Sequence, residues 1–135
     1  MTEPQLPDRA PSPAPQAVPA TVEDLRRNLA AVRARIASAA ERAGRDVAGI
    51  RLLPVSKTVP EERLRLAHAA GVTQMGENKV QEARRKARAL ADLGIRWVVI
   101  GHLQTNKAGD VASFADEFQA LDSLRVAQAL DRRLQ

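Results

Sequence analysis

The chain repeats one local pattern, a short apolar run followed by a helical pattern, and this repetition most constrains its fold. Strands are predicted at residues 50–56, 72–75, 95–100 and 117–121, and each is followed by residues with helical periodicity. Strands that alternate with helices at such short spacing are typical of a parallel sheet with helical crossover connections. We therefore predict an α/β fold built from parallel β-α units. In such folds ligands bind at the edge where the strands reach their carboxyl ends.

Capping residues predict where the helices begin. Thr21 and Asp24 form a predicted capping box for a helix that ends near Gly44, ahead of the first strand. Thr58 and Glu61 form a second predicted capping box, directly after the first strand. The first unit is therefore predicted as a strand, a short turn and a helix.

Local signals also describe the first strand and the last helix. Pro54 lies inside the first predicted strand and has no backbone N–H, which predicts an edge position or irregular pairing. Asp122 or Ser123 is placed to cap the last helix.

The amino-terminal composition differs from that of the rest of the chain. Residues 1–20 hold six of the eight prolines, with no apolar core and little positive charge. This predicts a disordered, partly polyproline-like tail, not a signal or transit peptide, with residues 21–135 as the folded domain. Cysteine is absent, which excludes disulfides and thiolate metal sites and fits a cytoplasmic protein. No apolar stretch approaches the length of about eighteen residues that a membrane span needs.

Charge and aromatic content argue against a specific nucleic-acid partner. The net charge of +5 comes mainly from arginine, because only four residues are lysines. Surfaces for single-stranded nucleic acid interleave aromatic rings with basic groups, and the few aromatic residues here are not placed in that way. The basic cluster at 84–88 is predicted to be a solvated helix face. Metal-ligand spacings, a Walker loop and a Gly-x-Gly-x-x-Gly motif are absent from the sequence.

Three polar residues follow the predicted strands at the ligand-binding edge: Lys57, Asn78 and His102. Lys57 ends an apolar strand, where a primary amine can be desolvated enough to lose its proton and attack a carbonyl. Asn78 and His102 add an amide and an imidazole at the same edge. Such a set can hold an aromatic, oxygenated small molecule.

Each of these residues also has an ordinary structural role open to it. Lys57 can be a solvated lysine just past a strand, Asn78 can be the cap of its helix, and His102 can be a satisfied polar residue at a helix start. Trp97, inside the third predicted strand, is expected in the core. From pattern alone these alternatives stay open.

Three ordered motifs resemble the pyridoxal phosphate homeostasis proteins, the YggS/PROSC type. The motifs are residues 53–58 (LPVSKT), 76–82 (GENKVQE) and 97–107 (WVVIGHLQTNK). The resemblance covers about residues 22–135. Three motifs in the same order and at matching spacing are highly specific.

The resemblance implies a fold, a cofactor and site residues. Members resemble the amino-terminal domain of alanine racemase, a (β/α)8 TIM-type barrel that carries pyridoxal 5'-phosphate (PLP) as a Schiff base on a lysine. By motif that lysine is Lys57, with Asn78 near the cofactor ring and His102 at the same mouth. The family is non-catalytic: it binds PLP and hands it to PLP-dependent apoenzymes in vitamin B6 homeostasis. We therefore expect this chain to be a PLP carrier and not an enzyme.

The chain departs from the family in length and at position 59. A complete barrel needs about 250 residues, so we expect a truncated half-barrel that lacks the family's later phosphate-binding residues. Many relatives carry a second lysine where Val59 stands here, so release of PLP is expected to differ. Binding should be weak and insensitive to the phosphate. A whole barrel would be a monomer, whereas a fragment would pair at its sheet edges or aggregate.

Two other function classes remain open. The first is a fragment of a PLP-dependent racemase or decarboxylase of the same barrel type, or an inactive truncated product. Such enzymes generally need a further domain that supplies a second acid/base residue. The second is an interaction or nucleic-acid module that uses the 84–88 face.

Overall fold

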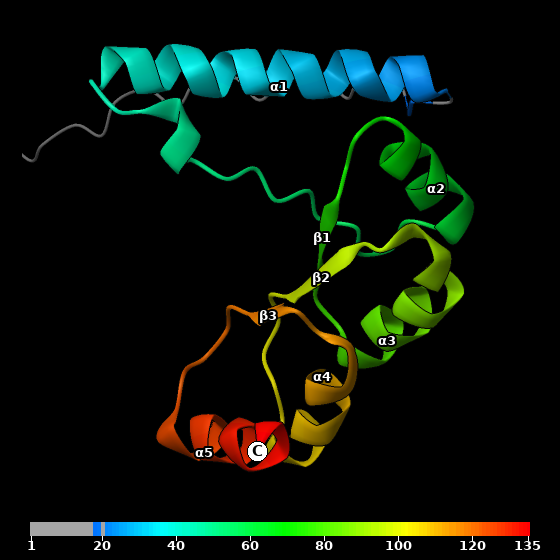
Figure 1. Cartoon of the computed structure of the whole chain (residues 1–135), viewed down its shortest axis with the longest axis vertical. Helices are drawn as coiled ribbons and strands as arrows, with labels where there is room; N and C mark the ends of the chain where they lie inside the picture. Colours follow the sequence, from blue (N-terminus) through cyan, green and yellow to red (C-terminus); the bar gives the residue numbers. More distant parts are fainter. Residues whose placement is uncertain (1–17, 20) are drawn as a thin grey trace, which may run out of the picture.

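The computed structural model of the chain describes residues 18–19 and 21–135 (Figure 1). The tail predicted at residues 1–20 lies outside the described residues, apart from Val18 and Pro19. Across the described part of the chain, no helix is long and apolar enough to cross a membrane.

The centre of the molecule is a parallel three-stranded sheet in the order β1-β2-β3. The strands are β1 (Gln74–Glu77), β2 (Arg96–Val99) and β3 (Glu117–Phe118). All three pair in parallel, and a helix lies between each strand and the next along the chain. The predicted parallel β-α architecture is therefore confirmed. The first of these strands starts two residues later than predicted and extends to Glu77, two residues past the predicted end.

The segment 50–56 is not the buried strand that the sequence predicts. Its pairing with β1 is an isolated bridge between Val55 and Gly76, and Val55 is half-exposed. The Ser56 N–H donates to the Gly76 carbonyl over 2.9 Å, and the Gly76 N–H donates to the Pro54 carbonyl over 2.8 Å. Pro54 has no N–H to donate, so the ladder does not continue and the irregular pairing expected at this proline is confirmed.

The described residues also form five α-helices and three short 3-10 helices. They are α1 (Val22–Arg42), η1 (Val47–Gly49), α2 (Glu61–Ala69), α3 (Val80–Ala89), η2 (Ala91–Leu93), η3 (Thr105–Lys107), α4 (Ala108–Phe114) and α5 (Leu124–Leu134). Figure 1 shows α2, α3 and α4 fanned along one side of the strands, with α1 lying across the end of the molecule beside α2.

Two predicted caps are confirmed and one is wrong. The Thr21 and Asp24 side chains form the reciprocal capping box of α1, and the Ser123 hydroxyl caps α5. The box predicted at Thr58 does not form, because Pro60 is the N-cap of α2 and caps it with no side-chain bond. The Thr58 hydroxyl instead donates to the carbonyl of the preceding residue over 2.6 Å.

The core consists of two apolar clusters on the helix side of the sheet. The first contains Met75 of β1 and Trp97 of β2, which pack against Leu64 of α2. The second is centred on Val99 and Val111, between β2 and α4. Trp97 is only 4% exposed, so its predicted place in the core is confirmed.

Candidate functional site

The segment 50–56 and the strands end at one edge of the sheet, here called the strand-end edge. Val55 pairs with Gly76 in parallel, and Lys57 and Asn78 each follow their bridge residue by two positions. Parallel pairing therefore places Lys57 and Asn78 beside each other at this edge. The loop after β2, which carries His102, begins at the same edge, because the Ile100 N–H donates to the carbonyl of the last β1 residue.

Asn78 is not the helix cap that its position allowed. The N-cap of α3 is Lys79, which makes no side-chain capping bond. Asn78 is exposed and lies against Gly101, which is buried. A Cβ atom at Gly101 would lie 2.0 Å from the backbone oxygen of Asn78 and 2.8 Å from its side-chain oxygen. Only glycine allows the two loops to approach so closely.

His102 is exposed and belongs to a loop, not to a helix start. Its Nδ1 lies 3.2 Å from an Asp122 carboxylate oxygen. The imidazole is therefore oriented by a residue that follows β3. Three successive β-α loops thus contribute polar groups to the strand-end edge.

Asn78 and His102 line one open cavity of about 470 Å³ at this edge. The other lining residues are Lys79, Val80, Gln81, Glu82, Gln104 and Lys107. Lys57 is not among the lining residues and lies beside the cavity, in the neighbouring turn. The structure therefore brings two of the three predicted residues into one cavity and places the third at its border.

Lys57 is exposed, so the expectation that burial would desolvate its amine is wrong for this structure. Within residues 18–19 and 21–135, no hydrogen bond or ion pair engages its side-chain amine. The residue belongs to a tight turn, in which the Val59 N–H donates to the Ser56 carbonyl over 3.1 Å. We call residues 56–59 the Lys57 turn. The amine is free and accessible.

The Lys57 turn contains a strained residue. Thr58 has a φ of 63°, and it is the one residue other than glycine with a positive φ among those that the structure describes. The left-handed conformation costs a residue with a Cβ atom about 1–2 kcal/mol. Such strain persists only where the surroundings fix the backbone.

The surroundings that fix this turn are charged and mostly buried. The Lys86 amine, fully buried, lies 2.5 Å from Glu77 and 3.0 Å from Glu82, and it donates to the Ser56 carbonyl over 2.7 Å. The Thr58 N–H donates to Glu82 over 3.2 Å. We call the side chains of Lys86, Glu77 and Glu82 the Lys86 network.

The network is completed by the serine that precedes Lys57. The Ser56 hydroxyl, which is buried, donates to the same Glu77 oxygen over 2.7 Å. The other Glu77 carboxylate oxygen is buried, and it has no hydrogen-bond partner among the described residues. The hydrogen bond from Lys86 lowers the pKa of Glu82 below its ordinary value, and the bond from the Thr58 backbone adds to the effect.

The sequence interpretation of 84–88 as a solvated face is wrong at Lys86, which is completely buried. A signal was available: Lys86 follows buried Ala83 by three positions and precedes buried Leu90 by four. This spacing puts Lys86 on the apolar face of α3. The acidic partner Glu77 ends the strand on which this face packs.

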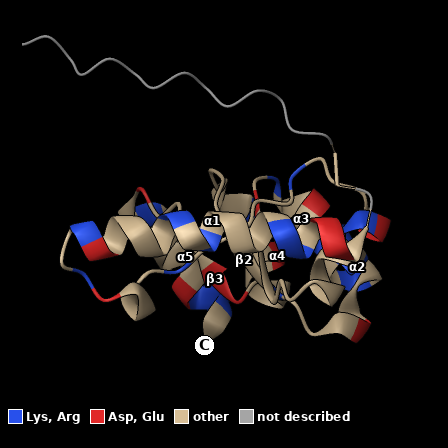
Figure 2. Cartoon of the chain, turned by 90° about the horizontal axis from the view of Figure 1, so that it is seen from above, with Lys and Arg blue, Asp and Glu red and all other residues tan. Residues whose placement is uncertain are grey.

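The arginines of the cluster are largely paired. Arg84 lies 2.8 Å from Asp110, and Arg85 forms an ion pair with Glu61. Figure 2 shows basic and acidic residues interspersed over the helices, without a broad basic face in this view. The geometry gives no support to a polyanion-binding surface at α3.

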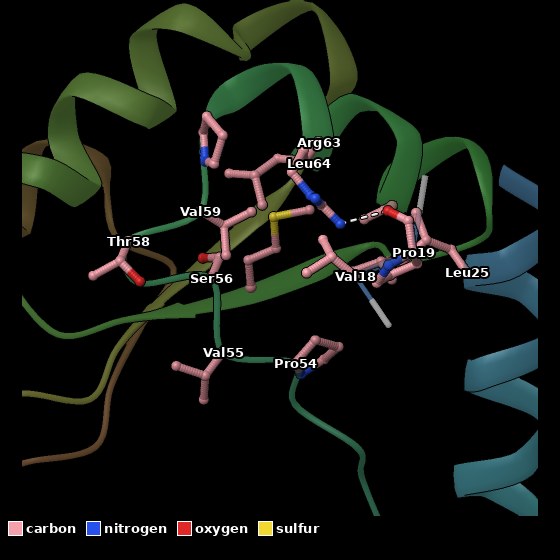
Figure 3. Close-up of a pocket in the computed structure, with 14 residues that line it drawn as sticks. Val18, Pro19, Leu25, Pro54, Val55, Ser56, Thr58, Val59, Arg63 and Leu64 are labelled. Atoms are coloured by element: carbon pink, nitrogen blue, oxygen red, sulfur yellow. Dashed lines mark hydrogen bonds between the residues drawn. The ribbon is translucent and has the colours of Figure 1, made fainter. Parts of the chain in front are cut away.

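A second cavity, which the sequence did not predict, lies behind the Lys57 turn. It has a volume of about 450 Å³, and its lining is almost entirely apolar. Figure 3 shows Pro54, Val55 and Val59 on one side and Val18 on the other, with the Arg63 guanidinium donating to the Pro19 carbonyl. The cavity offers few polar groups to orient a ligand. Among the described residues, no cluster of histidine and acidic side chains could hold a metal ion.

Comparison with known proteins identifies relatives. No protein-family model matches the chain. The pyridoxal phosphate homeostasis protein of Pseudomonas aeruginosa is 46% identical over 106 residues, which are 78% of this chain and 46% of that protein. The protein of the same name from Escherichia coli is 43% identical over 82% of this chain and 48% of its own length. The one from Mycobacterium tuberculosis is 38% identical over 86% of this chain and 49% of its own length. The chain spans about half the length of the curated relatives it matches.

Solved structures agree with these relatives. PipY of Synechococcus elongatus PCC7942, solved with PLP bound, superposes with a TM-score of 0.70 at 34% identity, over 81% of this chain and 47% of PipY. An unknown protein from Bifidobacterium adolescentis gives a TM-score of 0.71 at 33% identity, over 83% of this chain and 50% of that one.

The fold defines a class, the proteins built from parallel β-α units. Within that class, the chain is similar to proteins named pyridoxal phosphate homeostasis protein, at 37–46% identity over most of its length. The family resemblance seen in the sequence motifs is thereby confirmed.

Proposed function

We propose that this chain binds PLP as a reversible Schiff base on Lys57 and serves intracellular vitamin B6 homeostasis without catalytic turnover. The observation that carries the proposal is the free Lys57 amine in a turn that hydrogen bonds from Lys86 and to Glu82 fix at the strand-end edge. The relatives are named pyridoxal phosphate homeostasis proteins, and PipY was solved with PLP bound. Location in the cytoplasm and hand-over to PLP-dependent apoenzymes belong to the same proposal.

The residues at the edge fit the aldehyde and the ring of PLP. An aldehyde needs an accessible primary amine, and Lys57 supplies one. A ring with polar substituents needs hydrogen-bonding groups beside that amine, and Asn78 and His102 line the adjacent open cavity. Lys86, in contrast, is buried and fully engaged, so it is not available for condensation.

Bound PLP would supply a reactive aldehyde: the lysine nitrogen adds to the aldehyde carbon, a C=N bond replaces C=O, and one water leaves. The residues of the chain orient this addition. The Lys57 turn sets the direction in which the amine leaves the sheet edge, and Gly101 keeps the Asn78 loop close beside it. Because Lys57 is exposed here, desolvation of its amine must come from the bound ring itself.

We further propose that the β-α units form half of a (β/α)8 barrel, with the chain before residue 21 as a tail. The ion pair of Arg51 with Glu117 supports a curved sheet, as a barrel requires, because the Arg51 nitrogen and the Glu117 oxygen are 2.8 Å apart. These residues belong to the two outer segments of the row, 50–56 and β3. Strands in a sheet lie about 4.8 Å apart, so three steps across a flat sheet would separate the backbones by about 14 Å. A curled row brings the outer segments within reach of each other.

The experiment is titration of the purified chain with PLP, followed by borohydride reduction and peptide mapping. Reduced label should accumulate on Lys57 in preference to Lys79 and Lys107. Lys57→Ala and Lys57→Arg should both abolish this preferred label, and the arginine variant controls for charge. Pyridoxal should label Lys57 nearly as well as PLP, because the phosphate is expected to contribute little. Equal labelling of all accessible lysines would refute the proposal, and racemisation of alanine by the chain would favour an enzyme.

A further inference from the structure

We propose that Lys86 and Glu82 are positioning residues for Lys57: the buried Lys86 charge and the partly buried Glu82 charge hold the Lys57 turn in the conformation that presents its amine to PLP. This inference rests on the proposed function. Neither residue has an accessible group that can take the place of the Lys57 amine, since Lys86 is fully buried and Glu82 is acidic.

The network holds both flanks of Lys57. On one side, the Lys86 amine donates to the carbonyl of Ser56 over 2.7 Å. On the other, a Glu82 oxygen accepts from the backbone N–H of Thr58 over 3.2 Å. The same Glu82 oxygen lies 3.0 Å from the Lys86 amine, so the two hydrogen bonds belong to one charged cluster. Lys57 itself takes no part and stays free.

The turn needs these hydrogen bonds because its backbone is strained. Thr58 adopts a positive φ of 63° that a residue with a Cβ atom disfavours. Without an external constraint, Thr58 would relax toward negative φ and the direction of the Lys57 side chain would change. The hydrogen bond from the Thr58 N–H to Glu82 opposes that relaxation.

Burial of charged groups costs free energy, so the Lys86 network is an unfavourable way to stabilise the fold alone. Lys86 and Glu77 are both completely buried, and one Glu77 oxygen has no partner. Well-packed apolar side chains of similar volume are often as stabilising as a buried ion pair. A network that serves stability alone therefore has a simpler apolar equivalent, whereas an apolar side chain cannot hold the Ser56 carbonyl and the Thr58 N–H.

Glu82 is the residue through which the inference can be tested without unfolding the chain, because its side chain is 25% exposed. Glu82→Met removes the acceptor for Thr58 at nearly constant size, and Glu82→Gln restores an acceptor oxygen. Glu62→Met is the matched control, since Glu62 is exposed on α2. A Glu77→Met, Lys86→Met double variant removes the buried charges together.

The measured quantity is the ratio of reduced PLP label on Lys57 to that on Lys79 in the same molecules. Reductive methylation with formaldehyde gives the same ratio for a small aldehyde that needs no orientation. Glu82→Met and the double variant should lower the PLP ratio about tenfold, because a misplacement of about 1 Å can reduce an oriented reaction by up to about a hundredfold. Glu82→Gln and Glu62→Met should keep the PLP ratio, and all variants should keep the methylation ratio.

The outcomes separate the two proposals. If wild-type protein shows no preference for Lys57, the proposed function fails. If the wild type shows the preference and folded Glu82→Met retains it, the positioning role is overturned. A parallel fall of the PLP and methylation ratios would also overturn it, because the amine would then have lost exposure and not orientation. Should the double variant not fold, the comparison of Glu82→Met with Glu82→Gln decides the matter.

Discussion

Replacement of Gly101 by alanine should damage both the stability and the ligand edge of this protein. The added Cβ atom would lie 2.0 Å from the backbone oxygen of Asn78 and 2.9 Å from its carbonyl carbon. Ordinary contacts of this kind lie at 3.4–4 Å, so the Asn78 loop would have to move by more than 1 Å. The obstacle is backbone, and no side-chain rotation can relieve it.

The expected loss in free energy of unfolding is about 3 kcal/mol, the upper end of the usual range for overpacking. Urea unfolding is the assay, with fluorescence of the single tryptophan, Trp97, which is buried in the core. With a slope of about 2 kcal/mol per molar urea, the midpoint should fall by about 1.5 M. Displacement of the Asn78 loop should also weaken PLP labelling of Lys57.

Gly49→Ala is the matched control. Gly49 has no positive φ, and nothing lies within 4 Å of the position of an added Cβ atom. The alanine should therefore change the free energy of unfolding little, or raise it by about 0.4–1 kcal/mol through the unfolded chain. Equal urea midpoints for the two variants would show that the close approach of Gly101 to Asn78 is not a constraint.

Two further predictions concern ion pairs. The hydrogen bond from Arg51, followed by that from Gln119, lowers the pKa of Glu117 from 4.5 to about 2. The lowered pKa stabilises the fold fully above the unfolded value of 4.5, and this contribution should be lost as the pH falls toward about 2. Arg51→Met should flatten the fall of the urea midpoint over that range, and an unchanged slope would contradict the assignment. Lys86→Ala should cost about 3–5 kcal/mol in urea unfolding, because it leaves the Glu77 charge buried without its partner, and a cost below about 1 kcal/mol would contradict this.

The order of the β-α units could be predicted from the sequence because it depends on local signals. Apolar runs such as 95–100 and capping residues such as Thr21 and Ser123 act within a few neighbours, and the structure retains them. The segment 50–56 has a similar apolar pattern, but its pairing depends on β1, which is distant in sequence, and on the missing N–H of Pro54. The apolar pattern of 50–56 therefore could not predict that its hydrogen-bond ladder with β1 stops after a single bridge.

The sequence predicted which residues lie at the strand-end edge, but it did not predict their environment. Motif position identified Lys57, Asn78 and His102, yet the exposure of Lys57 depends on the fold around it. The burial of Lys86 was missed because a charged residue beside arginines resembles a solvated surface. Its acidic partner Glu77 lies nine positions earlier, in a different element, so the pair forms only when α3 packs on β1.

Burial of Lys86 has a practical consequence for lysine chemistry on this protein. Lysine side chains are only four in number, and Lys86 is completely enclosed in the folded state. Any amine-directed reagent should therefore reach Lys86 only after α3 has come away from the sheet. The fraction of Lys86 modified then reports, within each sample, how much of the protein was unfolded while Lys57 was being labelled.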